Sequence, residues 1–337
     1  MNTQKTLGVL DKIIGHTPMV EIRYSYNGKE GSVFAKCEHY NFTGSIKDRM
    51  ALYILKEAYR TGAINSEHEI WEATSGNTGI AFSALGRMLG HKVTIVMPDW
   101  MSIERKLMIT SFGAEIVLVS KEQGGFLGSI KYADNMAAER GNIFLPHQFS
   151  NENNYKAHEE TTGVEILHQL IKRGQKPDAF IAGVGTGGTV VGVGKALRKV
   201  FPNTKIHPLE PEESPTLSTG HKVGVHRIQG ISDEFIPEIM KYEPMDEVIS
   251  VSDGDSIIMA RKLASQLGLA VGISSGGNFI GAVKLAERYG FDKTIVTVFA
   301  DDNKKYLSTD LMKKEPVKDS YFAPNIQLLA IDPCERC

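Results

Sequence analysis

A lysine at the predicted start of a helix is the first candidate for chemistry in this chain. Within residues 41–49, Thr43-Gly44 predicts a turn, and Ser45 followed by Asp48 predicts a helix start with a capping hydroxyl and a first-turn acid. Lys47 then lies in the first turn, where the helix dipole and partial burial both lower the pKa of an amine. Such a lysine is a nucleophile that can form a Schiff base with a carbonyl cofactor. Taken alone, the stretch also fits a solvated lysine at a helix start.

A glycine-containing loop between a predicted strand and a predicted helix suits the binding of a carboxylate. The strand spans residues 69–73, and residues 74–79 read Thr-Ser-Gly-Asn-Thr-Gly. Ligands of α/β sheets bind at such strand ends, where free amides of the following helix favour anions. Asn77 adds a side-chain amide that can donate to a phenolate oxygen. An ordinary structural turn is the alternative interpretation.

Two further glycine-rich loops follow the same strand-to-helix pattern. Residues 185–189 lack the Gly-Lys-Ser/Thr of a nucleotide P-loop and the spacing of a dinucleotide fingerprint. The loop therefore favours a phosphate monoester, bound by Gly185, Thr186, Gly187, Gly188 and Thr189. Residues 272–277 offer Ser274 or Ser275 as a neutral hydroxyl for a ring nitrogen. A structural turn is the alternative for each.

One lysine, a carboxylate loop, a phosphate loop and a late serine are the parts that a pyridoxal phosphate enzyme needs. From about Ile13 to Leu307, the sequence resembles the cysteine synthase and cystathionine β-synthase group, which has the tryptophan synthase β fold type. The stretches that carry the resemblance are residues 15–18, 43–49, 72–80, 101–105, 148–149, 160–163 and 185–189.

The resemblance implies a role for each loop. Lys47 would form the internal aldimine with pyridoxal 5'-phosphate (PLP) and shuttle the α-proton of an amino-acid substrate. Asn77 would bond the ring oxygen of the cofactor, Ser274 its pyridine nitrogen, and residues 185–189 its phosphate. The substrate carboxylate would be bound by Thr74, Ser75, Gly76, Thr78 and Gln148. β-Replacement or β-elimination would proceed through an α-aminoacrylate, in a homodimer whose smaller domain closes over the substrate.

The sequence departs from that family at residues 230–235, Gly-Ile-Ser-Asp-Glu-Phe. Cysteine synthases usually carry small residues there, and cystathionine β-synthases often carry glycine-tyrosine-aspartate. An acid beside the β-carbon can activate a water, or it can bind the amino group of a second amino acid. We therefore expect a reaction that turns L-cysteine and water into L-serine and hydrogen sulfide, with Asp233 as base. The alternative interpretation is that Asp233 and Glu234 are solvated loop acids without a catalytic role.

Other functions remain open from the sequence. Within the same chemistry they are acetylserine sulfhydrylase activity, cystathionine or lanthionine formation, and diaminopropionate synthesis. A catalytically silent paralogue that acts as a binding partner is the alternative class, and retention of Lys47 argues against it. A dinucleotide-dependent oxidoreductase does not fit the loop spacing.

Alternating strands and helices predict an α/β fold with two domains, mostly parallel sheets and the cofactor in the interdomain cleft. The expected division is a smaller mobile domain at residues 42–150, a larger PLP-phosphate domain at 1–41 plus 151–310, and a tail at 311–337. We expect that tail to lie largely at the surface and to be flexible.

Composition narrows the setting. The chain has 337 residues, a formal net charge of −2 and 3 cysteines. Near-neutral charge gives no case for nucleic acid or a membrane surface, and no apolar run approaches transmembrane length. Few cysteines and no signal-peptide pattern predict a cytoplasmic protein without disulfides. We expect a buried, inert Cys37 and no metal site at Cys334 and Cys337.

Overall fold

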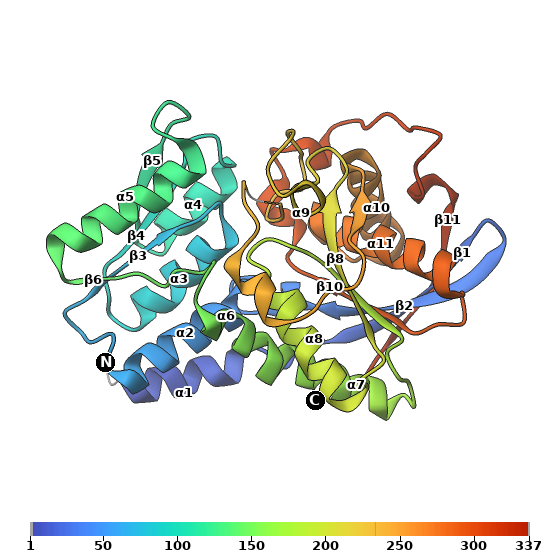
Figure 1. The fold of residues 1–337 in the computed structure, drawn as a ribbon, viewed down its shortest axis with the longest axis horizontal. Helices are drawn as coiled ribbons and strands as arrows, with labels where there is room; N and C mark the ends of the chain where they lie inside the picture. Colours follow the sequence, from blue (N-terminus) through green and yellow to red (C-terminus); the bar gives the residue numbers. More distant parts are fainter. Residues whose placement is uncertain (1–2, 233, 336–337) are drawn as a thin grey trace.

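The computed structural model describes residues 3–232 and 234–335. It contains two sheets that lie side by side, as Figure 1 shows. The larger has seven strands in the order β11-β1-β2-β10-β7-β8-β9, and the smaller has four in the order β5-β4-β3-β6. The smaller sheet is entirely parallel, and the larger is parallel from β2 to β9. The predicted α/β class with mostly parallel sheets is therefore confirmed.

The strands of the larger sheet come from both ends and the second half of the chain. They are β1 (Met19–Tyr26), β2 (Lys29–Cys37), β7 (Ala179–Gly183), β8 (Lys205–Pro211), β9 (Ile249–Val251), β10 (Ile295–Phe299) and β11 (Ile326–Pro333). The smaller sheet is formed by β3 (Glu69–Ala73), β4 (Val93–Pro98), β5 (Glu115–Val119) and β6 (Ile143–Phe144). The central strands β4, β7 and β10 are rich in β-branched or apolar residues and are almost wholly buried, as strands covered on both faces should be.

Helices cover these sheets, and four of them begin within or directly after the predicted loops. The first half of the chain supplies α1 (Thr3–Ile13), α2 (Lys47–Thr61), α3 (Asn77–Met88), α4 (Ile103–Ser111) and α5 (Gly125–Arg140). The second half supplies α6 (Glu152–Ala157), α7 (Gly163–Lys172), α8 (Gly188–Val200), α9 (Thr216–Thr219), α10 (Asp253–Leu267) and α11 (Ile273–Tyr289). One turn of π-helix, His158–Thr162, joins α6 to α7.

The expected tail at residues 311–337 lies largely at the surface, as at residues 316–320, but its end forms a strand of the larger sheet where a flexible segment was expected. Strand β11 pairs antiparallel with β1, from Val20 opposite Pro333 to Tyr26 opposite Ile326. Cys334 follows that strand and is buried. The backbone of β11 forms hydrogen bonds along one edge of the larger sheet, so the end of the tail belongs to that sheet.

The domain boundaries remain a prediction, but the first helix, α1, does not pack where that division would place it. Leu7 and Leu10 of α1 share a hydrophobic cluster with Met50 and Leu55 of α2 and with α3. The first helix therefore packs with the elements of the smaller sheet, although the prediction placed residues 1–41 in the larger domain.

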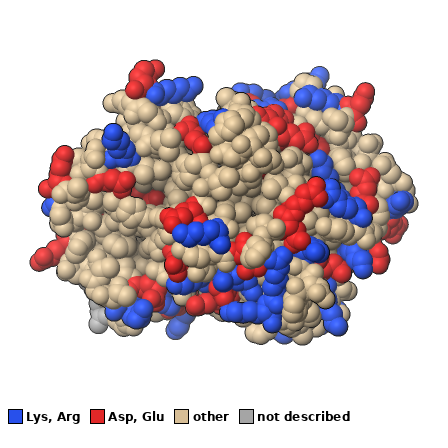
Figure 2. Space-filling model, viewed as in Figure 1, with Lys and Arg blue, Asp and Glu red and all other residues tan. Residues whose placement is uncertain are grey.

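Charged side chains of both signs are intermixed over the face shown in Figure 2. Within the described residues, no helix is both long enough and apolar enough to span a bilayer.

Candidate active site

The lysine loop is closed by the side chain of Asp48. The N–H and Oγ1 of Thr43 donate to the Asp48 carboxylate over 2.6 and 2.5 Å. Burial raises the pKa of Asp48 to about 6. Ser45 Oγ accepts from the N–H of Lys47 at 3.3 Å, as the predicted helix start requires. Asp48 is the predicted first-turn acid, and its carboxylate also turns back to Thr43, so that the loop fixes Lys47 as the first residue of α2.

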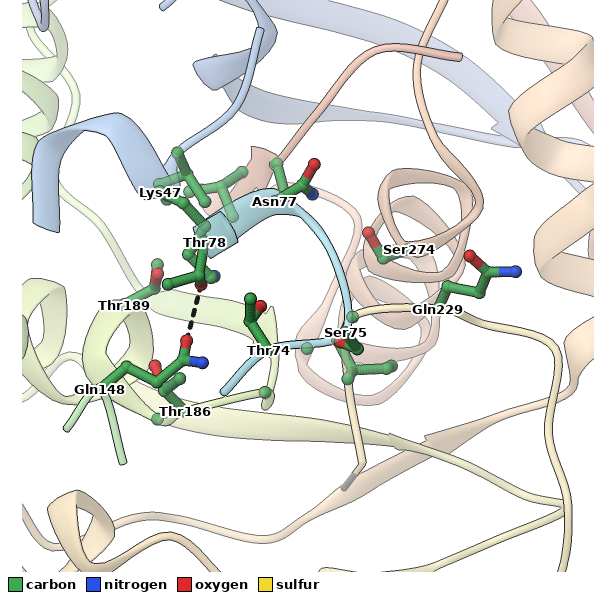
Figure 3. Close-up of a pocket in the computed structure, with 18 of the residues that line it drawn as sticks. Lys47, Thr74, Ser75, Asn77, Thr78, Gln148, Thr186, Thr189, Gln229 and Ser274 are labelled. Atoms are coloured by element: carbon green, nitrogen blue, oxygen red, sulfur yellow. Dashed lines mark hydrogen bonds between the residues drawn. The ribbon is translucent and has the colours of Figure 1, made fainter. Parts of the chain in front are cut away.

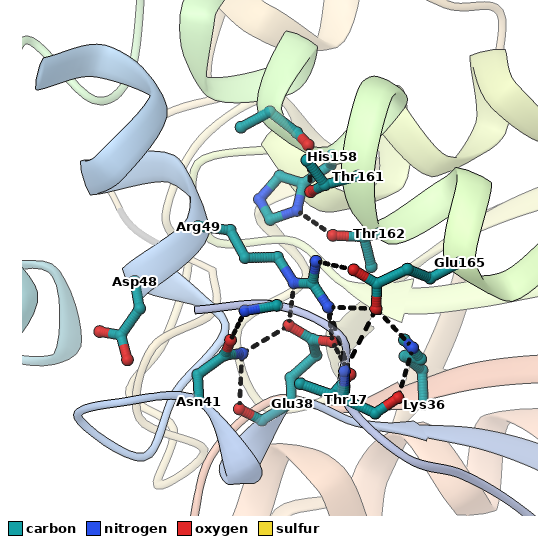
Figure 4. Close-up of polar contacts among 12 residues, drawn as sticks. Thr17, Lys36, Glu38, Asn41, Asp48, Arg49, His158, Thr161, Thr162 and Glu165 are labelled. Carbon is teal, nitrogen blue, oxygen red and sulfur yellow. Dashed lines mark hydrogen bonds and ion pairs between the residues drawn. The ribbon is translucent and has the colours of Figure 1, made fainter. Parts of the chain in front are cut away.

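A buried ion network, formed by Lys36, Glu38, Arg49 and Glu165, holds the same helix from below (Figure 4). Arg49 contacts Glu38 and Glu165, each at 2.6 Å, and Lys36 lies 2.7 Å from Glu165. Burial alone would raise the pKa of Glu165, but Arg49 and Lys36 lower it to about 2. Arg49 is two residues from Lys47, so this network anchors the reactive lysine to β2 and α7.

The carboxylate loop lies across a cavity from Lys47 (Figure 3). Thr78 Oγ1 donates to Gln148 Oε1 at 2.6 Å, and Gln148 Nε2 donates to the carbonyl of Ala73 at 3.0 Å. Thr74 Oγ1 accepts from the N–H of Gly76 at 3.1 Å. The structure thus brings the predicted carboxylate ligands together, with Thr74, Ser75, Thr78 and Gln148 all lining the cavity.

Gly76 does not line the cavity wall itself, but its lack of a side chain makes room for Arg105. A Cβ on Gly76 would lie 2.5 Å from Arg105 Cδ. Arg105 is only 1% exposed, donates to Tyr306 Oη at 3.1 Å and contacts Gln229. Because Arg105 lines the cavity beside the carboxylate loop, it adds a buried cation to an anion-binding site.

The phosphate loop joins β7 to α8 and tolerates little more than glycine. A Cβ on Gly188 would lie 2.0 Å from Asn154 Oδ1, and one on Gly185 would lie 2.4 Å from the carbonyl of Gly230. Gly187 has a φ of 83°, in the left-handed region that favours glycine. The backbone can therefore approach an oxyanion closely, at the amino end of a 13-residue helix.

Two threonines complete that loop. Thr186 Oγ1 accepts from Asn154 Nδ2 at 2.9 Å, and Thr189 Oγ1 lies 3.5 Å from His158 Nε2. The cavity wall includes Gly185, Thr186, Gly187 and Thr189, whereas Gly188 is covered by Asn154.

Asn77 and Ser274 face the same cavity from the starts of α3 and α11. Asn77 Nδ2 donates to Asp301 Oδ2 at 2.7 Å. Its Oδ1 is buried and has no hydrogen-bond partner within the described part of the chain. A polar side chain in this state suits a ligand that provides the missing partner.

These observations test the fit of PLP to the site. The glycine cradle suits a phosphate, and Lys47 provides an amine. Asn77 Nδ2 has a second N–H besides the one directed at Asp301, and this N–H can donate to the phenolate oxygen of PLP. The described residues that line the inner cavity include Lys47 and Arg105 but no aspartate or glutamate. Two cations without acids complement the phosphate of PLP and the carboxylate of an amino acid.

An outer cavity of about 520 Å³ continues from Ser75 and Arg105 toward solvent. Its wall includes Ser232 and Glu234, and the predicted base Asp233 lies outside the described residues. Glu234 Oε1 lies 2.9 Å from Lys222 Nζ in a partly exposed ion pair.

Sequence reasoning assigned no role to several residues of the site. Arg105 lies in a stretch that carried the family resemblance, so its position was noted without a function. Asn154 and Gln229 carry no local motif, and their contacts bring together parts of the chain that are far apart in sequence.

Neither Cys37 nor Cys334 lines the two cavities, and Cys337 lies outside the described residues. Cys37 is fully buried, and burial raises the pKa of its thiol to about 12, as expected for an inert thiol. Among the described residues, no group of three histidine, cysteine, aspartate or glutamate side chains could hold a metal ion.

Fold and site together define a PLP enzyme of fold type II. A family model described as pyridoxal-phosphate dependent enzyme matches residues 10–301. The chain is 42% identical over 308 residues to a cysteine synthase of Staphylococcus aureus, covering 91% of this chain and 98% of the relative. It belongs to the cysteine synthase family of PLP-dependent enzymes, and it is a β-replacement enzyme of that family.

Solved structures agree with this assignment. A hydrogen sulfide-producing enzyme from Fusobacterium nucleatum is 55% identical, with a TM-score of 0.96 and coverage of 99% of this chain and 100% of that one. An aspartate-to-asparagine variant of this enzyme, in complex with an α-aminoacrylate intermediate, has a TM-score of 0.97 with the same identity and coverage.

Proposed function

We propose that this enzyme converts L-cysteine and water into L-serine and hydrogen sulfide, with Asp233 as the base that activates the water. The observation that carries the proposal is the 55% identity to a hydrogen sulfide-producing enzyme over nearly the whole chain. The complex of an aspartate-to-asparagine variant of that enzyme with an α-aminoacrylate intermediate supports a role for an aspartate after the β-substituent has left.

The first half of the proposed reaction uses the inner cavity. Bound PLP withdraws electrons from Cα and so favours loss of the α-proton. Lys47 takes that proton, and the Cβ–S bond breaks as sulfur leaves as hydrogen sulfide. Thr74, Ser75, Gly76, Thr78 and Gln148 hold the substrate carboxylate and thereby orient the Cα–H bond. Residues 185–189 would hold the phosphate of the cofactor, and Asn77 and Ser274 would bond its ring oxygen and ring nitrogen.

The second half uses the outer cavity. Asp233 removes a proton from a water molecule while the water oxygen bonds to Cβ, and Lys47 returns a proton to Cα. The outer cavity, with a volume of about 520 Å³, supplies the path for water and for the departing sulfide. Glu234 is the weaker candidate for the base because Lys222 lies 2.9 Å from its carboxylate.

The test is the Asp233→Asn variant with cysteine as the sole substrate. Serine formation should fall by about 10²–10⁴-fold, the usual contribution of a general base, while the visible absorption of bound cofactor is kept. Glu234→Gln is the matched control and should keep serine formation near the level of the unaltered enzyme. Unchanged serine formation in Asp233→Asn would end the base assignment.

Acetylserine sulfhydrylase activity is the second candidate, supported by the 42% identity to a cysteine synthase. The unaltered enzyme separates the two functions. Serine and hydrogen sulfide from cysteine alone support the first. Cofactor absorption without sulfide from cysteine, together with cysteine formed from acetylserine and sulfide, supports the second.

We also propose that the enzyme is a homodimer, as the family resemblance implies. Analytical ultracentrifugation of the PLP-loaded protein tests this directly. A dimer mass is expected for a chain of 37.1 kDa, and a monomer across the concentration range contradicts the proposal.

A further inference from the structure

The backbone that leads into Asp233 is held in a conformation that serine rarely adopts. Ser232 has a φ of 53°, in the left-handed region, where residues other than glycine, asparagine and aspartate are strained. Such strain persists only where the surroundings fix the residue, and it is concentrated at functional sites. Ser232 is only 8% exposed, so those surroundings are protein.

Hydrogen bonds from three separate segments hold Ser232 in place. Its N–H donates to the carbonyl of Val184 at 2.7 Å, just after β7. Its Oγ donates to the carbonyl of Ser214 at 2.8 Å and lies 3.1 Å from Thr216 Oγ1. Its own carbonyl accepts from His226 Nε2 at 3.0 Å. Backbone and side chain of this one residue are therefore both fixed.

The contact from His226 defines the state of its ring. A carbonyl oxygen can only accept, so Nε2 must carry a proton. Burial lowers the pKa of His226, which favours the neutral ring at physiological pH. His226 and Ser232 both line the outer cavity, so their contact lies at the wall where water reaches the site.

The residues just before Ser232 pack directly against the cofactor side of the molecule. A Cβ on Gly185 would lie 2.4 Å from the carbonyl of Gly230, and a Cβ on Gly183 would lie 2.8 Å from Ile231 Cγ2. The segment 230–232 is thus fixed relative to the phosphate loop.

From this geometry we infer that His226 and Ser232 are positioning residues that direct the reaction toward serine by fixing the backbone before Asp233. The inference rests on the proposed function. Two outcomes compete once the Cβ–S bond has broken. Addition of water at Cβ gives serine and hydrogen sulfide from cysteine and water. Hydrolysis without that addition gives pyruvate, ammonia and hydrogen sulfide from the same cysteine and water. A displaced base favours the second outcome.

The ratio of pyruvate to serine, measured in one sample with cysteine as substrate, tests the inference. This ratio does not depend on the amount of active enzyme, so general destabilisation does not move it. His226→Leu removes the donor and should raise the ratio about two- to tenfold, the range for one lost hydrogen bond. His226→Gln retains a side-chain N–H and should restore most of the original ratio. His221→Leu is the matched control, because His221 is exposed on the same loop, and it should leave the ratio unchanged.

A second pair of variants separates backbone conformation from the hydroxyl. Ser232→Gly accepts the positive φ and loses only the hydroxyl, whereas Ser232→Ala adds the conformational strain. The pyruvate share should rise in both and more in the alanine variant. Amide hydrogen exchange across residues 228–236, with and without cofactor, provides a readout apart from turnover, and exchange should be faster in His226→Leu.

The outcomes are distinct. If the unaltered enzyme makes no serine from cysteine, the proposed function fails and this inference falls with it. If it makes serine but His226→Leu and Ser232→Gly keep the original product ratio, only the inference is overturned. If His226→Leu or Ser232→Ala does not fold, Ser232→Gly provides the comparison in its place.

Discussion

The buried ion network under Lys47 and the loop that carries Lys222 and Glu234 at the outer cavity are built differently. In the network, Lys36, Glu38 and Arg49 expose at most 2% of their side chains. In the loop, the ion pair of Lys222 with Glu234 leaves 41% and 30% exposed. The network is therefore shielded from solvent, whereas the ion pair of the loop lies partly in water, although Ser232 of the same loop is buried.

The largest expected effect is the loss of turnover when Lys47 is replaced. Lys47→Ala should abolish turnover of cysteine, with a loss of at least about 10³-fold, because Lys47 is the only amine among the described residues that line the inner cavity. The visible absorption that arises from the bond between lysine and cofactor should vanish as well. Lys56→Ala, in the same helix but exposed and paired with Asp11, is the control and should behave as the unaltered enzyme. Substantial turnover in Lys47→Ala would exclude this lysine as the reactive amine.

The next effect is on folding. Arg49→Met leaves Glu38 and Glu165 buried without their main partner, which should reduce the free energy of unfolding by about 3–5 kcal/mol. Arg60→Met removes an exposed pair with Glu57 on the same helix and should leave that free energy unchanged within error. Urea denaturation of the two variants measures the contrast. Equal effects would mean that burial does not distinguish the two ion pairs.

Gly188→Ala tests the cradle of the phosphate. The added Cβ would meet Asn154 Oδ1 at 2.0 Å, and Asn154 is also the donor to Thr186 and to the carbonyl of Gln148. Relief of this overlap should cost about 1–3 kcal/mol, seen as weaker binding in a titration of the apoenzyme with PLP. Gly8→Ala, where a Cβ meets nothing within 4 Å, should leave PLP affinity unchanged. Unaltered PLP affinity in Gly188→Ala would show that residues 185–189 can move to accommodate the added methyl group without loss of binding.

Glu72 gives a test that depends on pH. Burial raises its pKa to about 8, above the usual value of 4.5. The folded state then binds more protons than the unfolded state between these two values, so stability from this group rises as pH falls through that window, by about 1.4 kcal/mol per pH unit. Glu72→Gln should remove this contribution. Thermal melting from pH 6 to 9 should show a flatter profile for the variant, and parallel profiles would contradict the raised pKa.

The smallest expected effect is on stability, at the partly exposed ion pair of Lys222 with Glu234. Glu234→Gln breaks only the partly exposed pair with Lys222, and the unfolding free energy should change by less than about 1 kcal/mol. Chemical denaturation measures it. A loss of unfolding free energy as large as that of Arg49→Met would remove the contrast between the buried network and this exposed ion pair.

Local patterns were enough to predict the elements that carry the site. The strand at residues 69–73 was predicted with the bounds that the structure has, and it ends in the predicted Thr-Ser-Gly-Asn-Thr-Gly turn. Lys47 and the three loops could be located for the same reason, since strand, turn and helix start are all encoded within about ten residues.

Features that depend on distant contacts were not predicted. Arg105 gains its place from Gly76 and Tyr306, and His226 gains its place from the carbonyl of Ser232. Strand β11 was expected to be a loose tail because charges and prolines surround its apolar residues. Pairing with β1 and packing of Ile326 on the core order it. Asp233 was identified by its departure from a family pattern, a signal that says nothing about where its carboxylate lies.

The pairing of β11 with β1 has a consequence for the order in which the protein can be completed. About 300 residues separate Tyr26 from its partner Ile326, so β1 leaves the ribosome long before the strand that covers its edge. At usual synthesis rates that interval is roughly 15–60 s. During it, β1 presents free backbone groups that can pair with a neighbouring nascent chain. We expect the newly made protein to depend on chaperones, and a chain shortened before β11 to aggregate even though every residue of the cavity is present.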